Sequence, residues 1–215
     1  MSYPYNNNWM ANRASSSFAS RGRGRPREFD MDAALDNAVS VFRERGYHAT
    51  SIADLTAAMD LASGSVYKAF KDKRAIFVAA FDREGAIRKE KLRRITNTAK
   101  PGRDRIRDAL NFYVESSHGS EGRRGCLVVA SAAELATFDT EVAERVTAAI
   151  NKSETLMVDL IRQGQADGSI PAAIDSKVTA RLMLCLLQGM RVVGKTGRSR
   201  AEMTAVADAA MKLFN

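Results

Sequence analysis

Two short segments, Thr50-Ser-Ile-Ala-Asp-Leu55 and Gly64-Ser-Val-Tyr67-Lys-Ala-Phe70, have apolar residues at the three- and four-residue spacing of helices. The first predicts a helix that begins after Thr50 or Ser51, and the second predicts a helix over residues 63–70. A tight turn from Asp60 to Ala62 separates them. Two short helices joined by such a turn form a helix-turn-helix, which places its second helix in the major groove of DNA. The sequence therefore predicts this motif at about residues 51–70.

The chain around this motif is also helical in pattern, with no sustained alternation of apolar and polar residues. A first helix is expected near residues 31–45, where Asp30 is a suitable N-cap and Gly46 a suitable residue to end the helix. A long helix is expected over residues 73–98, after which Pro101-Gly102 breaks the chain. Five more helices are predicted at 103–118, 126–137, 139–166, 175–195 and 199–213. The predicted fold class is all-α.

The net charge of +8 is distributed unevenly over the 215 residues. Residues 1–29 carry five Arg against one Glu, whereas residues 30–75 carry one more acidic than basic residue. We expect residues 1–27 to form a disordered basic arm, because they are rich in Asn, Ser, Arg and Gly and lack apolar periodicity. Arg23 and Arg25 alternate with Gly and Pro like the core of an AT-hook, a shape that fits a narrow minor groove. The alternative is a solvated linker without DNA contacts.

The segments Thr50–Leu55 and Gly64–Phe70, together with Lys73 and the apolar pair Ile76-Phe77, resemble the N-terminal domain of the tetracycline-repressor (TetR) family of transcriptional regulators. The resemblance covers residues 27–87. It implies a three-helix DNA-binding domain over residues 28–87, followed by a helical ligand-binding and dimerisation bundle over residues 88–215.

The helix-turn-helix and the arm supply the expected DNA contacts. Gly64 lets the backbone approach a phosphate because it has no Cβ, Tyr67 offers a hydroxyl, and Lys73 opens the next helix toward the same strand. The expected DNA-binding residues are Arg23, Arg25, Thr50, Ser51, Ser63, Gly64, Ser65, Tyr67, Lys68 and Lys73.

Three positions depart from the family pattern. Asp60 stands where the family usually has Gly in the turn, and Asp tolerates left-handed backbone better than most residues. Ala62 stands where the family often has a capping Ser or Thr, which leaves open whether Ser63 caps the helix or contacts a base. Ala69 replaces a His that is common in the family, and this removes one potential DNA contact.

The last two predicted helices carry apolar stripes. Such stripes form either the core of one chain or a four-helix interface between two copies. The resemblance to the family implies the second arrangement. We expect a homodimer through these helices, which suits a palindromic double-stranded operator with two half-sites. The stripes are Val178, Leu182, Leu186, Gly189 and Val193 on the first helix, and Met203, Val206, Ala207, Ala210 and Met211 on the second.

A small-molecule effector, not identified by the sequence, is expected inside the C-terminal bundle. Each candidate residue also fits plain core, because helical spacing demands apolar side chains there. The candidates are Phe112, Tyr113, Ser116, Leu127, Glu134, Phe138, Met157, Leu160, Met183 and Leu187.

Cys126 follows Arg123-Arg124-Gly125 at a predicted helix start, where nearby cations and the helix N-terminus lower a thiol pKa. One hypothesis is a sensor of oxidants or electrophiles, since some repressors of the family use such a cysteine. The alternative is a small apolar residue in a helix.

Composition and motifs narrow the function classes. The longest purely apolar run, residues 182–187, is far shorter than the roughly 18 residues that span a bilayer. No secretory signal is recognisable, and two cysteines make neither a disulfide framework nor a metal knuckle, so we expect a cytoplasmic protein without metal or cofactor. His48 and His118 lie in unrelated contexts, which argues against an enzyme.

The function predicted is a sequence-specific transcriptional regulator, a repressor that an effector releases from its operator. Three alternatives remain: a repressor that senses through the Cys126 thiol, a nonspecific architectural DNA-binding protein, and an unrecognised all-α enzyme.

Overall fold

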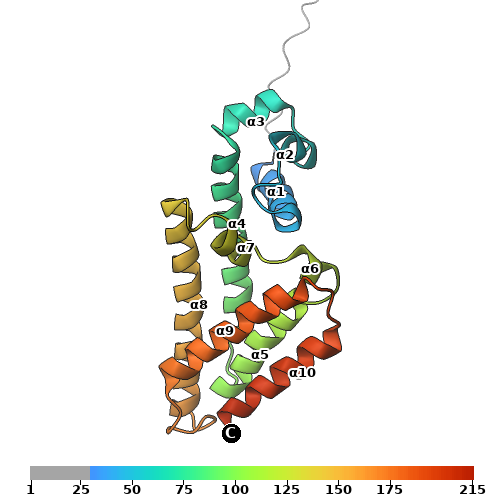
Figure 1. Cartoon of the computed structure of the whole chain (residues 1–215). Coiled ribbons are helices and arrows are strands. Elements are labelled where there is room, and N and C mark those ends of the chain that lie inside the picture. The colour runs from blue at the N-terminus through green and yellow to red at the C-terminus, as the bar shows by residue number, and fades with distance from the viewer. Residues whose placement is uncertain (1–29) are drawn as a thin grey trace, which may run out of the picture.

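The computed structural model describes residues 30–215, and this part of the chain is entirely helical (Figure 1). The predicted arm, with Arg23 and Arg25, lies outside the described residues. The elements are α1 (Met31–Arg45), α2 (Ile52–Ala58), α3 (Ser63–Ala69), α4 (Lys73–Thr96), α5 (Gly102–Ser116), α6 (Gly119–Arg124), α7 (Leu127–Glu134), α8 (Thr140–Ala166), α9 (Ser176–Gly194), α10 (Arg200–Met211) and a terminal 3-10 turn, η1 (Lys212–Phe214).

Local chemistry sets the ends of the first helices. Asp30 caps α1 by accepting from the N–H groups of Asp32 and Ala33, and Gly46 ends α1 at a φ of 79°. Ser51 and Asp54 form a capping box at the start of α2. Among the described residues, Asp60 alone adopts a positive φ without being glycine, at 53°, as its place in the turn predicts.

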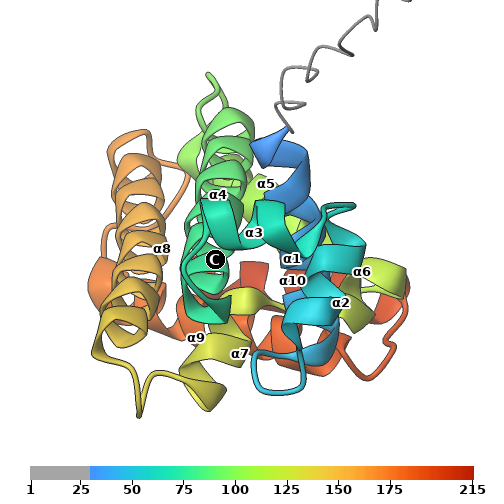
Figure 2. The same ribbon diagram turned by 90° about the horizontal axis from the view of Figure 1, so that it is seen from above.

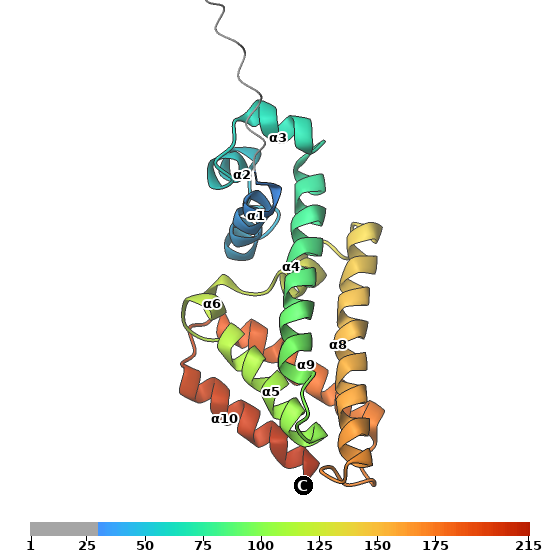
Figure 3. The same cartoon turned by 180° about the vertical axis from the view of Figure 1, so that it is seen from behind.

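The helix α4 connects the two ends of the molecule. It runs unbroken for 24 residues, from Lys73 to Thr96, and the side chain of Asp72 caps its start (Figure 3). The predicted domain boundary between residues 87 and 88 therefore falls inside a continuous helix.

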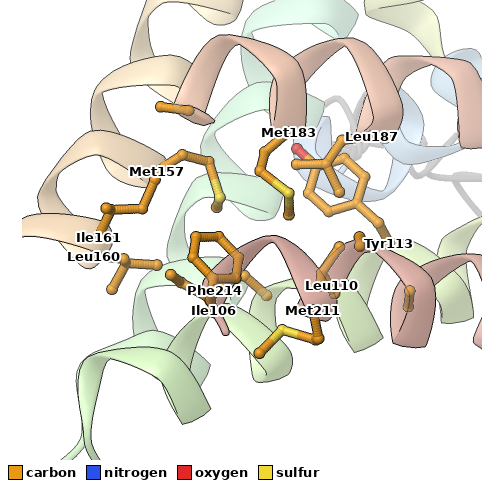
Figure 4. Packing of buried hydrophobic residues seen from close by; sticks show 14 of the residues in the cluster. Ile106, Leu110, Tyr113, Met157, Leu160, Ile161, Met183, Leu187, Met211 and Phe214 are labelled. Atoms are coloured by element: carbon orange, nitrogen blue, oxygen red, sulfur yellow. The ribbon is translucent and has the colours of Figure 1, made fainter. Parts of the chain in front are cut away.

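Two hydrophobic cores lie along this axis. The first holds the inward faces of α1 to α3 and the N-terminal half of α4, and it also takes Leu127, Leu135, Val142 and Val146 from α7, the loop after it, and α8. The second joins α5, the C-terminal half of α8, α9 and α10, with Phe214 packed against Met157, Leu160 and Ile161 (Figure 4). The DNA-binding domain is thus packed directly onto α7 and α8.

The structure corrects one expectation about the elements. The predicted helices leave residues 119–125 as a connection between 103–118 and 126–137, but this segment contains α6. Gly122 is buried, and a Cβ there would lie 2.7 Å from the carbonyl oxygen of Ser117 and 3.0 Å from that of Gly194. The glycine therefore allows α6 to pack closely between α5 and α9, a reason that helical periodicity does not reveal.

Within residues 30–215, every helix is too short or too polar to cross a membrane. The same residues contain no cluster of His, Cys, Asp and Glu arranged to hold a metal ion.

Candidate nucleic-acid interface

The helix α3 presents a polar face at the end of the molecule opposite the C-terminus (Figures 1 and 2). Ser63, Gly64, Tyr67 and Lys68 are exposed on it, and Tyr67 is 57% exposed. Val66, which is 1% exposed, anchors the opposite face in the first core. A short helix held by one buried side chain therefore offers a row of hydrogen-bonding groups to an external partner.

Gly64 has no packing role inside the chain. A Cβ built at this position would meet no atom within 4 Å. Glycine keeps the surface of α3 low here, so a phosphate backbone can approach its amide groups closely.

The N-cap position of α3 settles part of an open question. Ala62 is the N-cap and makes no side-chain hydrogen bond, so Ser63 is the first helical residue and not the cap. The hydroxyl of Ser63 is thus left on the exposed face beside Gly64.

Thr50 does not fit its predicted role. It is 2% exposed, and its hydroxyl donates to the carbonyl oxygen of Gly46 at 2.6 Å. Its side chain therefore fixes the loop before α2 and does not reach DNA in this conformation. Ser51 is exposed, but its hydroxyl already donates to Asp54 at 2.7 Å, and this contact with Ser51 lowers the pKa of Asp54 to about 2.

Lys73 is also used inside the protein. Its Nζ donates to the carbonyl oxygens of Tyr47 and Thr50, each at 2.9 Å, and lies 4.3 Å from the centre of the Tyr47 ring. These contacts tie the start of α4 to the loop between α1 and α2. A phosphate contact by Lys73 remains a prediction.

Glu134, expected from the sequence to contact an effector, instead holds this loop from the other side. The N–H of Tyr47 donates to Glu134 of α7 at 2.9 Å. Gly46 makes room for it, because a Cβ there would lie 2.5 Å from a carboxylate oxygen of Glu134. The two residues are 87 positions apart, and no local pattern signals such a contact.

The basic residues of the DNA-binding domain are largely paired with acids. Arg83 binds Asp32 and Asp36, and Arg74 binds Asp139 and Glu141. These pairs agree with the slightly acidic sum of residues 30–75 and leave Lys68 as an exposed cation on α3. These observations favour DNA binding through a few placed residues of α3 over binding through a uniformly basic face.

The predicted effector residues do not form one site. Tyr113, Met157, Leu160, Met183 and Leu187 are closely packed in the second core, with Phe112 and Ser116 at its margin (Figure 4). Leu127 and Glu134 instead face the DNA-binding domain, so including them in the bundle core was wrong. Phe138 was wrong for another reason: it is 85% exposed in the loop before α8.

A shallow surface depression, without room for even a water molecule, lies where α7 meets the predicted DNA-binding domain. Its walls combine three aromatic rings with the side of α7. The lining residues are Phe42, Tyr47, Phe77, Leu127, Ala130, Ser131, Glu134 and Leu135.

Cys126 is the N-cap of α7 and is 9% exposed. The buried cation beside it is Arg191 of α9, which sequence reasoning did not find; it is 1% exposed, and burial lowers its pKa. Of the two arginines that precede Cys126, Arg124 is paired with Glu44 and Glu121.

The apolar stripes of the last two helices differ in burial. On α9, Val178, Leu182 and Val193 are exposed, at 63%, 51% and 41%. On α10, Met203, Ala207, Ala210 and Met211 are buried within the chain itself, and the exposed apolar side chains near this end are Val206 and Leu213. The stripe on α10 is therefore mostly intramolecular core, whereas the stripe on α9 is available to a partner.

Known proteins are similar to this chain in sequence and in fold. A family model described as "Bacterial regulatory proteins, tetR family" matches residues 34–80, and one described as "Tetracyclin repressor-like, C-terminal domain" matches residues 102–210. The HTH-type transcriptional repressor ComR of Escherichia coli is 27% identical over 197 residues, which are 90% of this chain and 93% of ComR. The HTH-type transcriptional repressor BdcR of the same organism is 22% identical over 87% of this chain and 90% of BdcR.

Among the solved structures that resemble the chain, one holds operator DNA. It is a cysteine mutant of the TetR family regulator CifR in complex with a 26-base-pair double-stranded operator. It is 31% identical and has a TM-score of 0.80, covering 89% of this chain and 100% of CifR.

Proposed function

The chain belongs to the tetR family of bacterial regulatory proteins, and on this premise we propose how it acts. It is a DNA-binding transcriptional repressor that holds an operator through α3 and is released when a small molecule binds its C-terminal half. It is a regulator and not an enzyme. The observation that carries the proposal is the exposed face of α3, which presents Gly64, Tyr67 and Lys68. The opposite face is fixed in the first core by the buried side chain of Val66. The operator complex of CifR supports the same partner for this fold.

The operator is proposed to be palindromic, because the repressor is proposed to act as a homodimer. The exposed apolar stripe of α9 supports this assembly, with Val206 and Leu213 as the contribution of the C-terminal helices. A regulator of this kind acts where the chromosome is, so we place it in the cytoplasm.

The exposed face of α3 is tested by Lys68→Ala, with Lys212→Ala as the matched control at the far end of the molecule. The operator is first obtained by selection from random DNA with the full chain. Loss of one phosphate contact should lower affinity and reduce the slope of log affinity against log salt by about 1. Unchanged affinity and slope would contradict the role of α3, and equal binding to all sequences would favour an architectural protein.

The effector remains unidentified. We propose that it binds at the margin of the second core beside Phe112 and Ser116, where Arg88 lies 4.9 Å from the Phe112 ring centre. The packed residues Tyr113, Met157, Leu160, Met183 and Leu187 would contact an effector only if the bundle opened.

A second candidate function is release through the Cys126 thiol. The observation that favours it is the position of Cys126 at the start of α7, beside the buried guanidinium of Arg191. Cys126→Ser should abolish the release of operator DNA by peroxide or a soft electrophile, while Cys185→Ser, which changes an exposed cysteine, should not. Release that persists in Cys126→Ser refutes this function.

A further inference from the structure

The loop between α6 and α7 is held by arginines from both halves of the molecule. The carbonyl oxygen of Gly125 accepts from Arg43 of α1 twice, from Nε at 3.1 Å and from Nη2 at 2.9 Å. The same oxygen accepts from Nη2 of Arg191 of α9 at 2.5 Å. One backbone atom therefore connects α1 to α9, the helix that carries the exposed apolar stripe.

The Arg43 end of this connection is rigid. Its side chain is 12% exposed, and it also bonds the carbonyl and carboxylate of Glu121 and lies 3.8 Å from the carboxylate of Glu84. α6 itself contacts α1, α5 and α9. A displacement of Gly125 is thus passed to the C-terminal end of α1, which leads directly into the loop before the helix-turn-helix.

The Arg191 end is energetically unusual. Within residues 30–215 its guanidinium has no carboxylate within ion-pair distance, and its Nε and Nη1 are buried without a hydrogen-bond partner. The buried carboxylate of Glu84 and the side chain of Cys126 compensate part of its charge. Burying a charge still opposes folding, and apolar side chains commonly replace such groups without loss of stability. The burial of its charge therefore gives no reason for an arginine at this position, and its contact with Gly125 gives one.

We propose that Arg191 is a positioning residue for DNA recognition: through the shared Gly125 carbonyl it sets the orientation of the DNA-binding domain relative to α9. Because α9 carries the proposed dimer face, this linkage sets how far apart the two recognition helices of a dimer stand. The effect on DNA rests on the proposed function, whereas the effect on α1 does not.

The test compares Arg191→Met with Arg181→Met in the full chain. Arg181 lies on the same helix, but its side chain is 68% exposed and pairs with Glu154. In the free protein, Arg191→Met should keep or raise the melting temperature. It should also speed amide hydrogen exchange in residues 43–51 by about tenfold. The loop between α6 and α7 then loses its bond to Arg191 and holds Arg43, and with it the end of α1, less firmly. The control should change neither quantity.

On DNA, the selected operator is compared with versions whose half-sites are one base pair closer or farther apart. Arg191→Met should reduce the discrimination between these spacings by about tenfold, a change that simple destabilisation does not produce because it weakens all three equally. A double-mutant cycle with Arg43→Lys should be non-additive, since both arginines act on one oxygen.

Several results overturn the proposal. They are wild-type exchange in residues 43–51, unchanged spacing discrimination, additive effects in the cycle, or a variant that does not fold, which would show that Arg191 is kept for stability. If selection yields no operator, the proposed function fails, and the exchange measurement still decides the effect on α1.

Discussion

At the scale of single residues, glycine positions are decided by neighbours that lie far away in the chain. Gly46 combines a φ of 79° with a carboxylate of Glu134 where a Cβ would stand. Gly168 has nearly the same φ, 78°, but nothing within 4 Å of that point. Substituting each glycine by alanine therefore separates two losses of stability: the loss from left-handed backbone, at both positions, and the loss from a steric clash, at Gly46 alone.

Gly168→Ala should lower the free energy of unfolding by about 1 kcal/mol, the usual cost of left-handed backbone for a residue with a Cβ. Gly46→Ala should cost at least about 2 kcal/mol, because the new methyl also displaces Glu134 from the N–H of Tyr47. Urea denaturation of the two variants measures the difference. Equal losses would mean that Glu134 moves aside freely and does not hold the loop.

At the scale of elements, α2 is a seven-residue helix whose start depends on one capping box. The hydroxyl and N–H of Ser51 bind the carboxylate of Asp54, and Arg45 adds a contact at 2.5 Å. These partners hold the pKa of Asp54 at about 2, below its ordinary 3.8, with the Ser51 hydroxyl as the largest cause. The box is therefore a pH-dependent contribution to the first domain.

A depressed pKa stabilises the fold above the pKa of the unfolded chain, and this contribution is lost as pH falls through the folded value. The stability difference between the wild type and Asp54→Asn should thus be constant at neutral pH and shrink between about pH 4 and about pH 2. Denaturation midpoints across this range measure it. A pH-independent difference would contradict the depressed pKa.

At the scale of the whole molecule, two cores share α4 and α8, and the DNA-binding domain packs onto α7. An effector in the C-terminal half therefore acts on a domain to which it is connected through side chains as well as through α4. The exposed stripe of α9 lies outside both cores, and we expect it to be covered by a second copy.

Leu182→Glu should convert the dimer to a monomer at micromolar concentration, because it places a charge in the middle of the apolar stripe of α9. Ala173→Glu, at an exposed position before α9, should leave the dimer intact. Light scattering gives the mass of each. A monomeric wild type, or a dimeric Leu182→Glu, would rule out this interface.

The sequence by itself determined what depends on neighbours a few residues away. The bounds of α1, the left-handed turn at Asp60 and the helix-turn-helix follow from caps, turn chemistry and apolar spacing, and the structure confirms them. The spacing of Gly64, Tyr67 and Phe70 was also enough to indicate the family. All of these signals come from residues within four positions or a few helical turns of one another, so the sequence alone reveals them.

Only the tertiary structure decided which residues meet across long separations. It buried Thr50, turned Leu127 and Glu134 toward the DNA-binding domain, and brought Arg191 to Gly125 across 66 positions. Helical periodicity predicts that a side chain is buried. It does not predict in which of the two cores the side chain lies, because this depends on how whole helices pack. The contacts that connect the DNA-binding domain to the rest of the molecule are of this second kind.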